Sequence, residues 1–160
     1  MSELPEGPWT ELSMDFCGPF PSGDYLMVII DEYSRYPEVE ILKSTSSKTV
    51  IPKIDKILAS FGIPKVLKSD NGPPFNGSEF RNFAEHLGFR HRKITPLWPK
   101  PNAESERFMR TVEKTVRAAQ IEKQETFKFL RNYRATPECT TGKPYEMLFG
   151  RPMKKSKYRQ

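Results

Sequence analysis

The spacing of apolar residues changes along the N-terminal part of the chain, and this change restricts the chain to folds that combine a sheet with helices. Apolar and polar residues alternate over 12–17, which predicts a half-buried strand with Asp15 on the face opposite Met14. Two more strands are expected at 25–31 and at about 37–42, and their short connections favour an antiparallel meander.

From about residue 47 to residue 61 the apolar residues recur at intervals of three and four, which predicts a helix that buries one face. A short buried strand over 64–69 then delivers Asp70 at its carboxyl end, and a helix over 78–87 and a strand over 89–94 follow. The predicted fold class is therefore α/β, a mixed five-stranded sheet flanked by helices.

The C-terminal part of the chain is expected to be mainly helical. After a proline-rich loop, a long helix begins near Asn102, a good N-cap residue, and carries Glu106 on the side away from its apolar stripe. A last amphipathic helix is expected at 125–134. The predicted organisation is a lead-in at 1–8, one core domain at 9–152 and a basic mobile tail at 153–160.

Charge and hydropathy point to a globular protein with a polyanionic partner. Lys and Arg number 26 against 20 Asp and Glu, giving a formal net charge of +6, and most of the excess lies after the midpoint. Hydrophobic residues make up 36% of the chain, but the longest apolar run is far too short to span a bilayer. The first residues do not resemble a secretory signal, so we expect an intracellular protein without a membrane segment.

The cysteine and histidine content argues against a zinc site or a disulfide framework. Cys17 and Cys139 are the only cysteines, and Cys17 is expected to be an inert, buried small residue. His86 and His91 are the only histidines, and their spacing suits neither one helix face nor a zinc finger. We therefore interpret both histidines as surface polar residues.

Three acids lie at positions that favour a shared role. Asp15 is inside an apolar strand, Asp70 ends a strand at a Gly-Pro break, and Glu106 starts a helix after a loop. Three unrelated solvated acids are the alternative, and for carboxylates chosen at random this is the default. Convergent carboxylates bind Mg²⁺ with positions left for water and phosphate oxygens, which suits phosphodiester displacement. These three acids are our candidate metal-binding catalytic residues.

Several segments around the acids match one known signature. Thirty-five residues separate Asp70 from Glu106 (106 − 70 − 1). The matching segments are Met14–Pro19, Ile30–Arg35, Ser69–Gly72 and Thr95–Arg107, the last similar to the pattern S-P-x-x-P-x-x-N-G-x-x-E-R. In these features the chain, from about Trp9 to Pro152, resembles the integrase catalytic core family, especially the integrases of retroviruses and gypsy-type LTR retrotransposons.

The resemblance implies a ribonuclease H-like fold and a polynucleotidyl transferase that catalyses the 3′-processing and strand-transfer steps of DNA integration. It implies that Asp15 and Asp70 bind one Mg²⁺ or Mn²⁺ ion, that Glu106 joins Asp15 at a second ion, and that Asn71 assists. The implied partners are double-stranded DNA, as element ends and target, and other copies of the chain in a homodimer or higher oligomer. Such an activity implies a nuclear location.

Cationic and amide side chains near the acids are candidate contacts to DNA phosphates. The candidate DNA-binding residues are Asn71, Lys100, Asn102, Arg107, Arg110, Lys114 and Arg117. For the cations of the long helix, a solvated face paired with Glu113 is an equally good interpretation.

Two other functions stay open. One is a decayed or domesticated integrase core that binds DNA or protein without catalysis. Ala103, where the family usually has glycine, and the lack of the family's zinc and C-terminal domains in this sequence favour it, whereas the intact acids oppose it. The other is a ribonuclease H-like nuclease, which needs a further acid late in the chain; the Glu106-Arg107 pattern favours an integrase instead.

Overall fold

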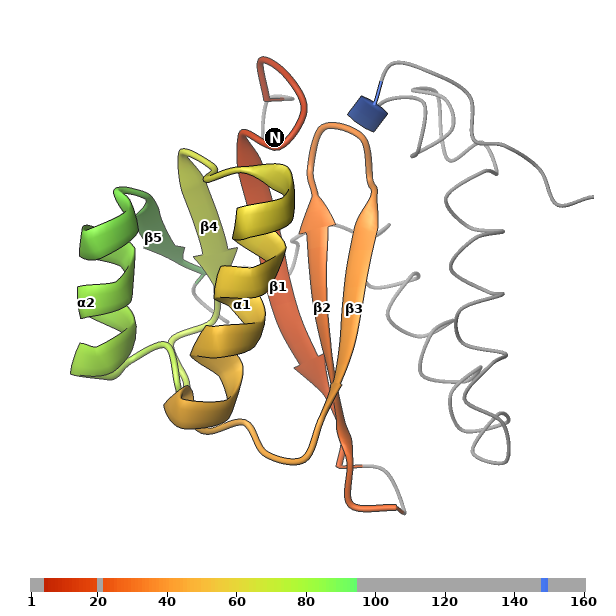
Figure 1. Ribbon diagram of the computed structural model, residues 1–160, viewed down its shortest axis with the longest axis vertical. Helices are drawn as coiled ribbons and strands as arrows, with labels where there is room; N and C mark the ends of the chain where they lie inside the picture. Colours follow the sequence, from red (N-terminus) through yellow and green to blue (C-terminus); the bar gives the residue numbers. More distant parts are fainter. Residues whose placement is uncertain (1–4, 20–21, 95–147, 150–160) are drawn as a thin grey trace, which may run out of the picture.

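The structure is a computed structural model that describes residues 5–19, 22–94 and 148–149. Its strands and helices follow one another in the order expected from the sequence (Figure 1). The strands are β1 (Glu11–Cys17), β2 (Tyr25–Asp31), β3 (Pro37–Leu42), β4 (Val66–Ser69) and β5 (Arg90–Lys93), and the helices are α1 (Ser47–Phe61) and α2 (Ser78–Leu87).

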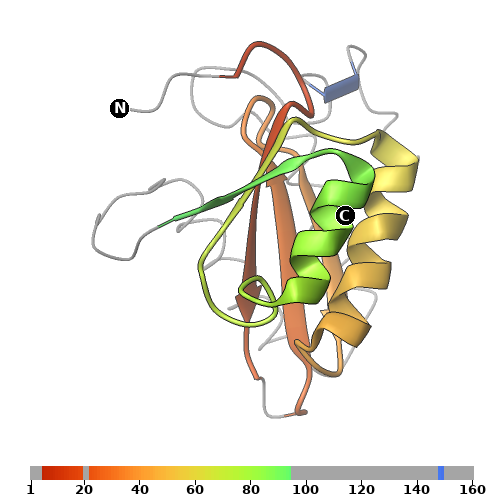
Figure 2. The ribbon, with the colours of Figure 1, turned by 90° about the vertical axis from the view of Figure 1, so that its left-hand side faces the viewer.

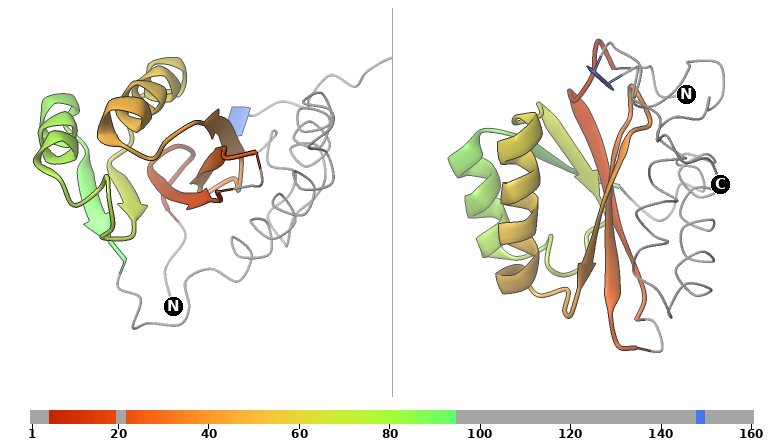
Figure 3. Two further views of the ribbon diagram at one scale, coloured as in Figure 1. Left: turned by 90° about the horizontal axis from the view of Figure 1, so that it is seen from below. Right: turned by 45° about the vertical axis from the view of Figure 1, so that its right-hand side comes forward.

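The strands form one mixed sheet in the order β3-β2-β1-β4-β5. β2 is antiparallel to both β1 and β3, whereas β4 is parallel to both β1 and β5. Helices α1 and α2 lie side by side on one face of the sheet (Figures 1 and 2), and the two views in Figure 3 show the same layering. The predicted mixed five-stranded sheet with flanking helices is confirmed.

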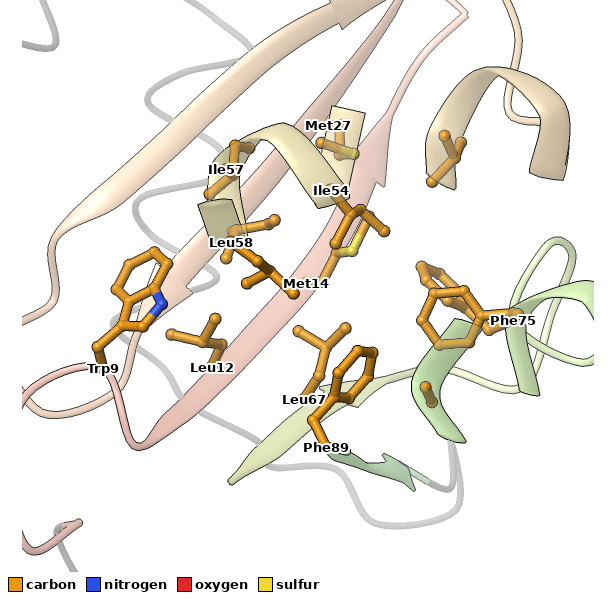
Figure 4. Packing of buried hydrophobic residues seen from close by; sticks show 14 of the residues in the cluster. Trp9, Leu12, Met14, Met27, Ile54, Ile57, Leu58, Leu67, Phe75 and Phe89 are labelled. Atoms are coloured by element: carbon orange, nitrogen blue, oxygen red, sulfur yellow. The ribbon is translucent and has the colours of Figure 1, made fainter. Parts of the chain in front are cut away.

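The hydrophobic core lies between the sheet and these helices. Leu12 and Met14 of β1 and Leu67 of β4 pack in one cluster with the apolar stripe of α1 (Figure 4). The buried residues of that stripe are Val50, Ile54, Ile57 and Leu58. Burial of each such side chain contributes about 1.5–3 kcal/mol. Because Leu12 and Met14 face the helices, Ser13 and Asp15, which alternate with them, face the opposite side of the sheet.

Strand β2 is buried on both faces, since every residue from Leu26 to Asp31 is buried. A strand covered on both sides is expected to have a continuous apolar sequence without alternation, as 26–30 does. β2 therefore forms the most apolar part of the sheet and supports β1 from one side.

Asp31 ends β2 as a buried acid and organises the turn to β3. Its Oδ1 accepts hydrogen bonds from the backbone N–H groups of Trp9 at 3.0 Å and Tyr33 at 3.4 Å. Its Oδ2 accepts from the Ser34 hydroxyl at 2.6 Å and the Ser34 backbone N–H at 3.2 Å. Burial raises the pKa of Asp31, and these hydrogen bonds oppose the rise. The carboxylate thus ties the segment before β1 to the β2–β3 turn.

An aromatic cluster closes the same end of the molecule. The Trp9 indole N–H donates to the backbone carbonyl of Gly62 at 2.7 Å, and its ring centroid lies 4.8 Å from that of Phe61. The rings of Tyr36 and Phe149 lie 5.8 Å and 5.9 Å from the Phe61 ring. The cluster therefore joins the segment before β1, the β2–β3 turn, the end of α1 and residue 149.

The observed strand ends differ slightly from the predicted ones. β4 begins at residue 66 rather than 64, β5 covers 90–93 rather than 89–94, and β1 begins at residue 11 rather than 12. The helices predicted after residue 102 lie outside the described residues. Neither α1 nor α2 is long and apolar enough to cross a membrane.

The prediction that Cys17 is buried is wrong, because its side chain is only half-buried. Cys17 lies two residues beyond Asp15 at the end of β1, on the face opposite the one that α1 and α2 cover. A side chain there does not enter the helix-covered core.

Candidate active site

Strands β1 and β4 bring Asp15 and Asp70 to one place on the sheet. The two strands are parallel neighbours, and Ser13 pairs with Lys68. Extending this register by two residues sets Asp15 opposite Asp70, immediately after β4 ends at Ser69. Adjacent strands lie about 4.8 Å apart. The two acids therefore stand side by side, on the face of the sheet opposite the helix-covered core.

Each of these acids has one carboxylate oxygen held by a backbone amide. The Phe16 N–H donates to Asp15 Oδ1 at 2.8 Å, and the Gly72 N–H donates to Asp70 Oδ1 at 3.0 Å. The turn after Asp70 is closed by a further bond, from the Phe75 N–H to the Gly72 carbonyl at 2.8 Å. Both side chains are exposed, so their second oxygens are open to solvent or to a ligand.

Asp15 and Asp70 interact electrostatically. The pKa of Asp15 is raised above its ordinary value, chiefly because the surrounding protein partly desolvates the carboxylate. The hydrogen bond from the Phe16 N–H lowers this pKa, and the negative charge of Asp70 raises it. Two acids that repel each other are stabilised by a cation placed between them, so the pair has the charge expected of a metal ligand set.

The third predicted acid lies in a part of the chain that the structure does not describe. Within 5–19, 22–94 and 148–149, no group of three or more His, Cys, Asp or Glu side chains is arranged to hold a metal ion. The described part of the site is thus a pair of carboxylates, and the roles of Asp15, Asp70 and Glu106 stay predictions.

The candidate DNA-binding residues divide in the same way. Asn71 directly follows Asp70 in the turn and is exposed, so it lies beside the acid pair. The remaining candidates lie outside the described residues; they are Lys100, Asn102, Arg107, Arg110, Lys114 and Arg117.

A charged cluster that we did not predict from the sequence lies on the same face of the sheet as Asp15 and Asp70. It is centred on Lys68, two residues before Asp70. The Lys68 ammonium lies 2.8 Å from Glu32 Oε2 and 3.3 Å from Glu11 Oε1, and the Ser13 hydroxyl donates to Glu32 Oε1 at 2.5 Å. The Lys68 side chain is only 11% exposed. A lysine within a short apolar strand was the available sequence signal, but its partners follow only from the strand pairing. The cluster links β1, β4 and the end of β2 directly behind the acid pair.

The prediction that His91 is a surface polar residue is wrong. Its Nε2 lies 2.6 Å from the Ser69 hydroxyl oxygen, and its ring lies 4.9 Å from that of Phe80 and 5.8 Å from that of Phe75. Burial is the main cause that lowers the pKa of His91; Lys93 lowers it further and Asp70 opposes the change. His86, by contrast, is exposed as predicted.

An electropositive groove of about 330 Å³ lies beside the Asp70 turn, between α2 and β5. Its lining includes the side chains of Arg81, Arg90 and Lys93 and one acid, Glu85. A concave surface with an excess of positive charge attracts anions, and this one is continuous with the turn that carries Asp70.

Comparisons with known proteins agree with this arrangement. The profile of the family described as integrase core domain matches residues 5–99. The chain is 31% identical to the protein K02A2.6 of Caenorhabditis elegans over 157 residues. This match covers 94% of this chain and 12% of the relative. It is 35% identical to the Gag-Pol polyprotein of woolly monkey sarcoma virus over 136 residues. This match covers 80% of this chain and 8% of the polyprotein. The chain thus spans only about a tenth of the length of these relatives.

Among solved structures, the chain is similar to the catalytic core domain of the HTLV-2 integrase, determined in complex with magnesium in a trimeric form. The TM-score is 0.72 at 18% sequence identity, and the match covers 89% of this chain and 97% of the other. At this identity the likeness establishes the fold, which is ribonuclease H-like.

Proposed function

Because the chain belongs to the integrase core domain family, we propose that it is a DNA strand transferase with Asp15, Asp70 and Glu106 as its catalytic acids. At the level of the family, the activity is polynucleotidyl transfer. The proposed reactions are 3′-processing of element ends by water and attack of the new 3′-hydroxyl on target DNA. The observation that supports this most directly is the electrostatic interaction between Asp15, on β1, and Asp70, directly after the parallel neighbouring strand β4.

The acid pair fits a divalent cation. Mg²⁺ and Mn²⁺ prefer oxygen ligands, and both side chains are carboxylates. In the part of the chain that the structure describes, Oδ1 of each acid accepts a backbone N–H, and no protein donor contacts Oδ2 of either. Burial is the main cause that raises the pKa of Asp15, and the repulsion from Asp70 that adds to it is relieved when a cation binds. Mg²⁺ or Mn²⁺ is therefore the proposed cofactor, with Glu106 completing the ligand set.

The protein's own groups have a positioning task in this proposal. A bound divalent ion activates the attacking water or hydroxyl and stabilises the leaving oxygen of an in-line displacement. The N–H groups of Phe16 and Gly72 hold Oδ1 of each carboxylate, which would leave Oδ2 of each acid to bind the cation. Asn71 lies next to Asp70, and the cations of the α2–β5 groove lie beside the turn that follows it; both are proposed contacts to DNA phosphates.

The test is strand transfer on a branched DNA that mimics the joined product, with Mn²⁺ and the purified chain. We expect divalent-ion-dependent joining or disintegration by the unaltered protein. Glu106→Gln, Asp15→Asn and Asp70→Asn should each abolish it, because each removes an anionic ligand. Asp55→Asn is the matched control, since Asp55 is an exposed acid on α1, on the other side of the sheet, and should keep full activity.

The rival is a core that binds DNA without catalysis. It is supported if the unaltered protein shows no ion-dependent joining while it and Glu106→Gln bind the branched DNA equally. The proposal also includes a homodimer or higher oligomer, measurable by light scattering, and a nuclear location, where the target DNA is found.

A further inference from the structure

We propose that His91 and Ser69 act as positioning residues that hold the backbone of Asp70, and so fix the carboxylate that the proposed function assigns to the metal site. This inference rests on the proposed function only for the role of Asp70. The contact itself joins β5, β4 and the Asp70 turn.

The hydrogen bonds define a short chain with one direction. The Ser69 hydroxyl donates to the backbone carbonyl of Asp70 at 2.9 Å. The same hydroxyl oxygen lies 2.6 Å from His91 Nε2. A hydroxyl has a single proton, so once Ser69 donates to Asp70 it can only accept from the imidazole. This arrangement requires the His91 tautomer with its proton on Nε2, and donation from Nε2 into the hydroxyl strengthens the bond that the hydroxyl makes to Asp70.

The chain of hydrogen bonds begins where strand β4 ends, at Ser69. The backbone N–H of Ile94 donates to the Ser69 carbonyl at 2.7 Å, and β4 stops at that residue. The Asp70 carbonyl is thus the first one beyond the strand, and its partner is a side chain rather than the next strand. The Ser69 hydroxyl therefore supplies a hydrogen-bond donor for the backbone of Asp70, one residue beyond the end of the strand.

The imidazole is itself held in place by aromatic packing. The ring of Phe80, from α2, is 4.9 Å from the His91 ring in an edge-to-face arrangement, and Phe75, from the Asp70 turn, is 5.8 Å away. Phe75 and Phe80 also contact each other at 5.1 Å. Both phenylalanines are buried, so the imidazole meets rigid neighbours. Its lowered pKa is consistent with a neutral ring that carries one N–H.

Loss of the imidazole donor should loosen the Asp70 backbone without removing any metal ligand. Removal of a group that hydrogen-bonds to a metal-binding residue typically weakens metal affinity by about 10–100-fold. We therefore expect His91→Phe, which keeps a ring in the aromatic packing but has no donor, to weaken Mn²⁺ binding by about tenfold. Ser69→Ala should have a similar effect, since it removes the middle member of the chain.

The experiment is a calorimetric Mn²⁺ titration of the full chain and its variants, with thermal unfolding measured in parallel. His91→Gln should restore most of the affinity lost in His91→Phe, because its terminal amide reaches the position of Nε2 and donates a hydrogen bond. His86→Phe, which changes the exposed histidine of α2, is the matched control and should bind Mn²⁺ like the unaltered protein. A purely structural role predicts affinity that follows the unfolding temperature, with no rescue by glutamine.

A second measurement separates this inference from the proposed function. The ¹³C chemical shift of the Asp70 carbonyl, recorded without metal, should change in both His91→Phe and Ser69→Ala. Unchanged shifts overturn the inference, as does unchanged Mn²⁺ affinity in both variants of a protein that binds Mn²⁺. If the unaltered protein does not bind Mn²⁺ but the carbonyl shift responds, the proposed function fails and the positioning of the Asp70 backbone stands.

Discussion

Partial burial is the main cause that raises the pKa of Asp15, and the negative charge of Asp70 raises it further, although the two residues lie far apart along the chain. The coupling follows from the parallel pairing of β1 with β4, which sets the two carboxylates at the same end of neighbouring strands. It is the property of the described residues that most resembles a metal site, because like charges are held together without a protein cation between them.

The first prediction tests this coupling directly. Asp70→Asn should lower the pKa of Asp15, since removing the neighbouring charge makes ionisation easier, while the partial desolvation of Asp15 is unchanged. The measurement is an NMR titration of the Asp15 side-chain carboxyl carbon in the metal-free chain. Asp55→Asn on α1 should leave the titration as it is. An Asp15 pKa that does not respond to Asp70→Asn means that the two acids do not converge in solution.

Much of the fold could be predicted from the sequence because its periodicities are local. Alternation over 12–17 correctly separates Met14 from Asp15, and the three-and-four spacing of α1 matches its buried residues. Strand ends were less accurate, because Pro64 and Phe89 are buried and apolar like strand residues but lie outside the hydrogen-bonded ladder. Burial alone does not define where pairing stops.

The candidate site was predictable only in part, for a physical reason. Asp15 lies within a strand and Asp70 directly follows one, and both strands can be predicted from the sequence, so the likeness of these acids to a known signature could be recognised. The partners of Lys68 and His91 could not be recognised in this way, because they lie on other strands and the contacts depend on the register between those strands. From the sequence, a histidine on an edge strand is expected to be exposed to solvent. In the structure, Phe80 of α2 packs against the His91 ring.

The second prediction concerns the charged cluster behind the acid pair. Lys68→Met should reduce the free energy of unfolding by about 3 kcal/mol, because Glu11 and Glu32 then face each other without their cation. Urea denaturation measures the change. Lys65→Met is the control, since Lys65 is 75% exposed and lies 3.9 Å from Glu6; it should cost less than about 0.5 kcal/mol.

A compensating variant decides whether charge is the cause. Lys68→Met combined with Glu11→Gln and Glu32→Gln should regain most of the lost stability, because neutral partners need no cation. If the triple variant is as unstable as Lys68→Met alone, the loss comes from packing of the lysine stem rather than from uncompensated carboxylates.

The third prediction is a pH dependence from Asp31. Burial raises the pKa of this carboxyl in the folded protein above its ordinary value of 3.8, so the folded state binds the proton more tightly than the unfolded state. Its contribution to stability is therefore fully present below pH 3.8 and is lost as the pH rises through the folded value. Asp31→Asn removes this dependence, although its poorer acceptors add a cost that does not vary with pH.

The measurement for Asp31 is urea unfolding of both proteins across the acid range. The unaltered protein minus Asp31→Asn should give a stability difference that falls as the pH increases. A difference that rises with pH shows that the hydrogen bonds from Trp9, Tyr33 and Ser34 outweigh desolvation and hold the pKa down.

The fourth prediction concerns the electropositive groove beside the Asp70 turn. Arg81→Glu and Arg90→Glu should each weaken binding of duplex DNA at low salt to a similar degree for any sequence, because contacts to phosphate carry no base information. The slope of log affinity against log salt should become shallower by about 0.9 for each phosphate contact removed. Lys56→Glu, an exposed change of the same charge on α1, is the control and lies outside the groove lining. Equal loss of affinity in all three variants means that net charge, and not the groove, attracts the DNA. A selective loss in Arg81→Glu and Arg90→Glu means that a stretch of DNA backbone binds between α2 and β5, beside the turn that follows Asp70.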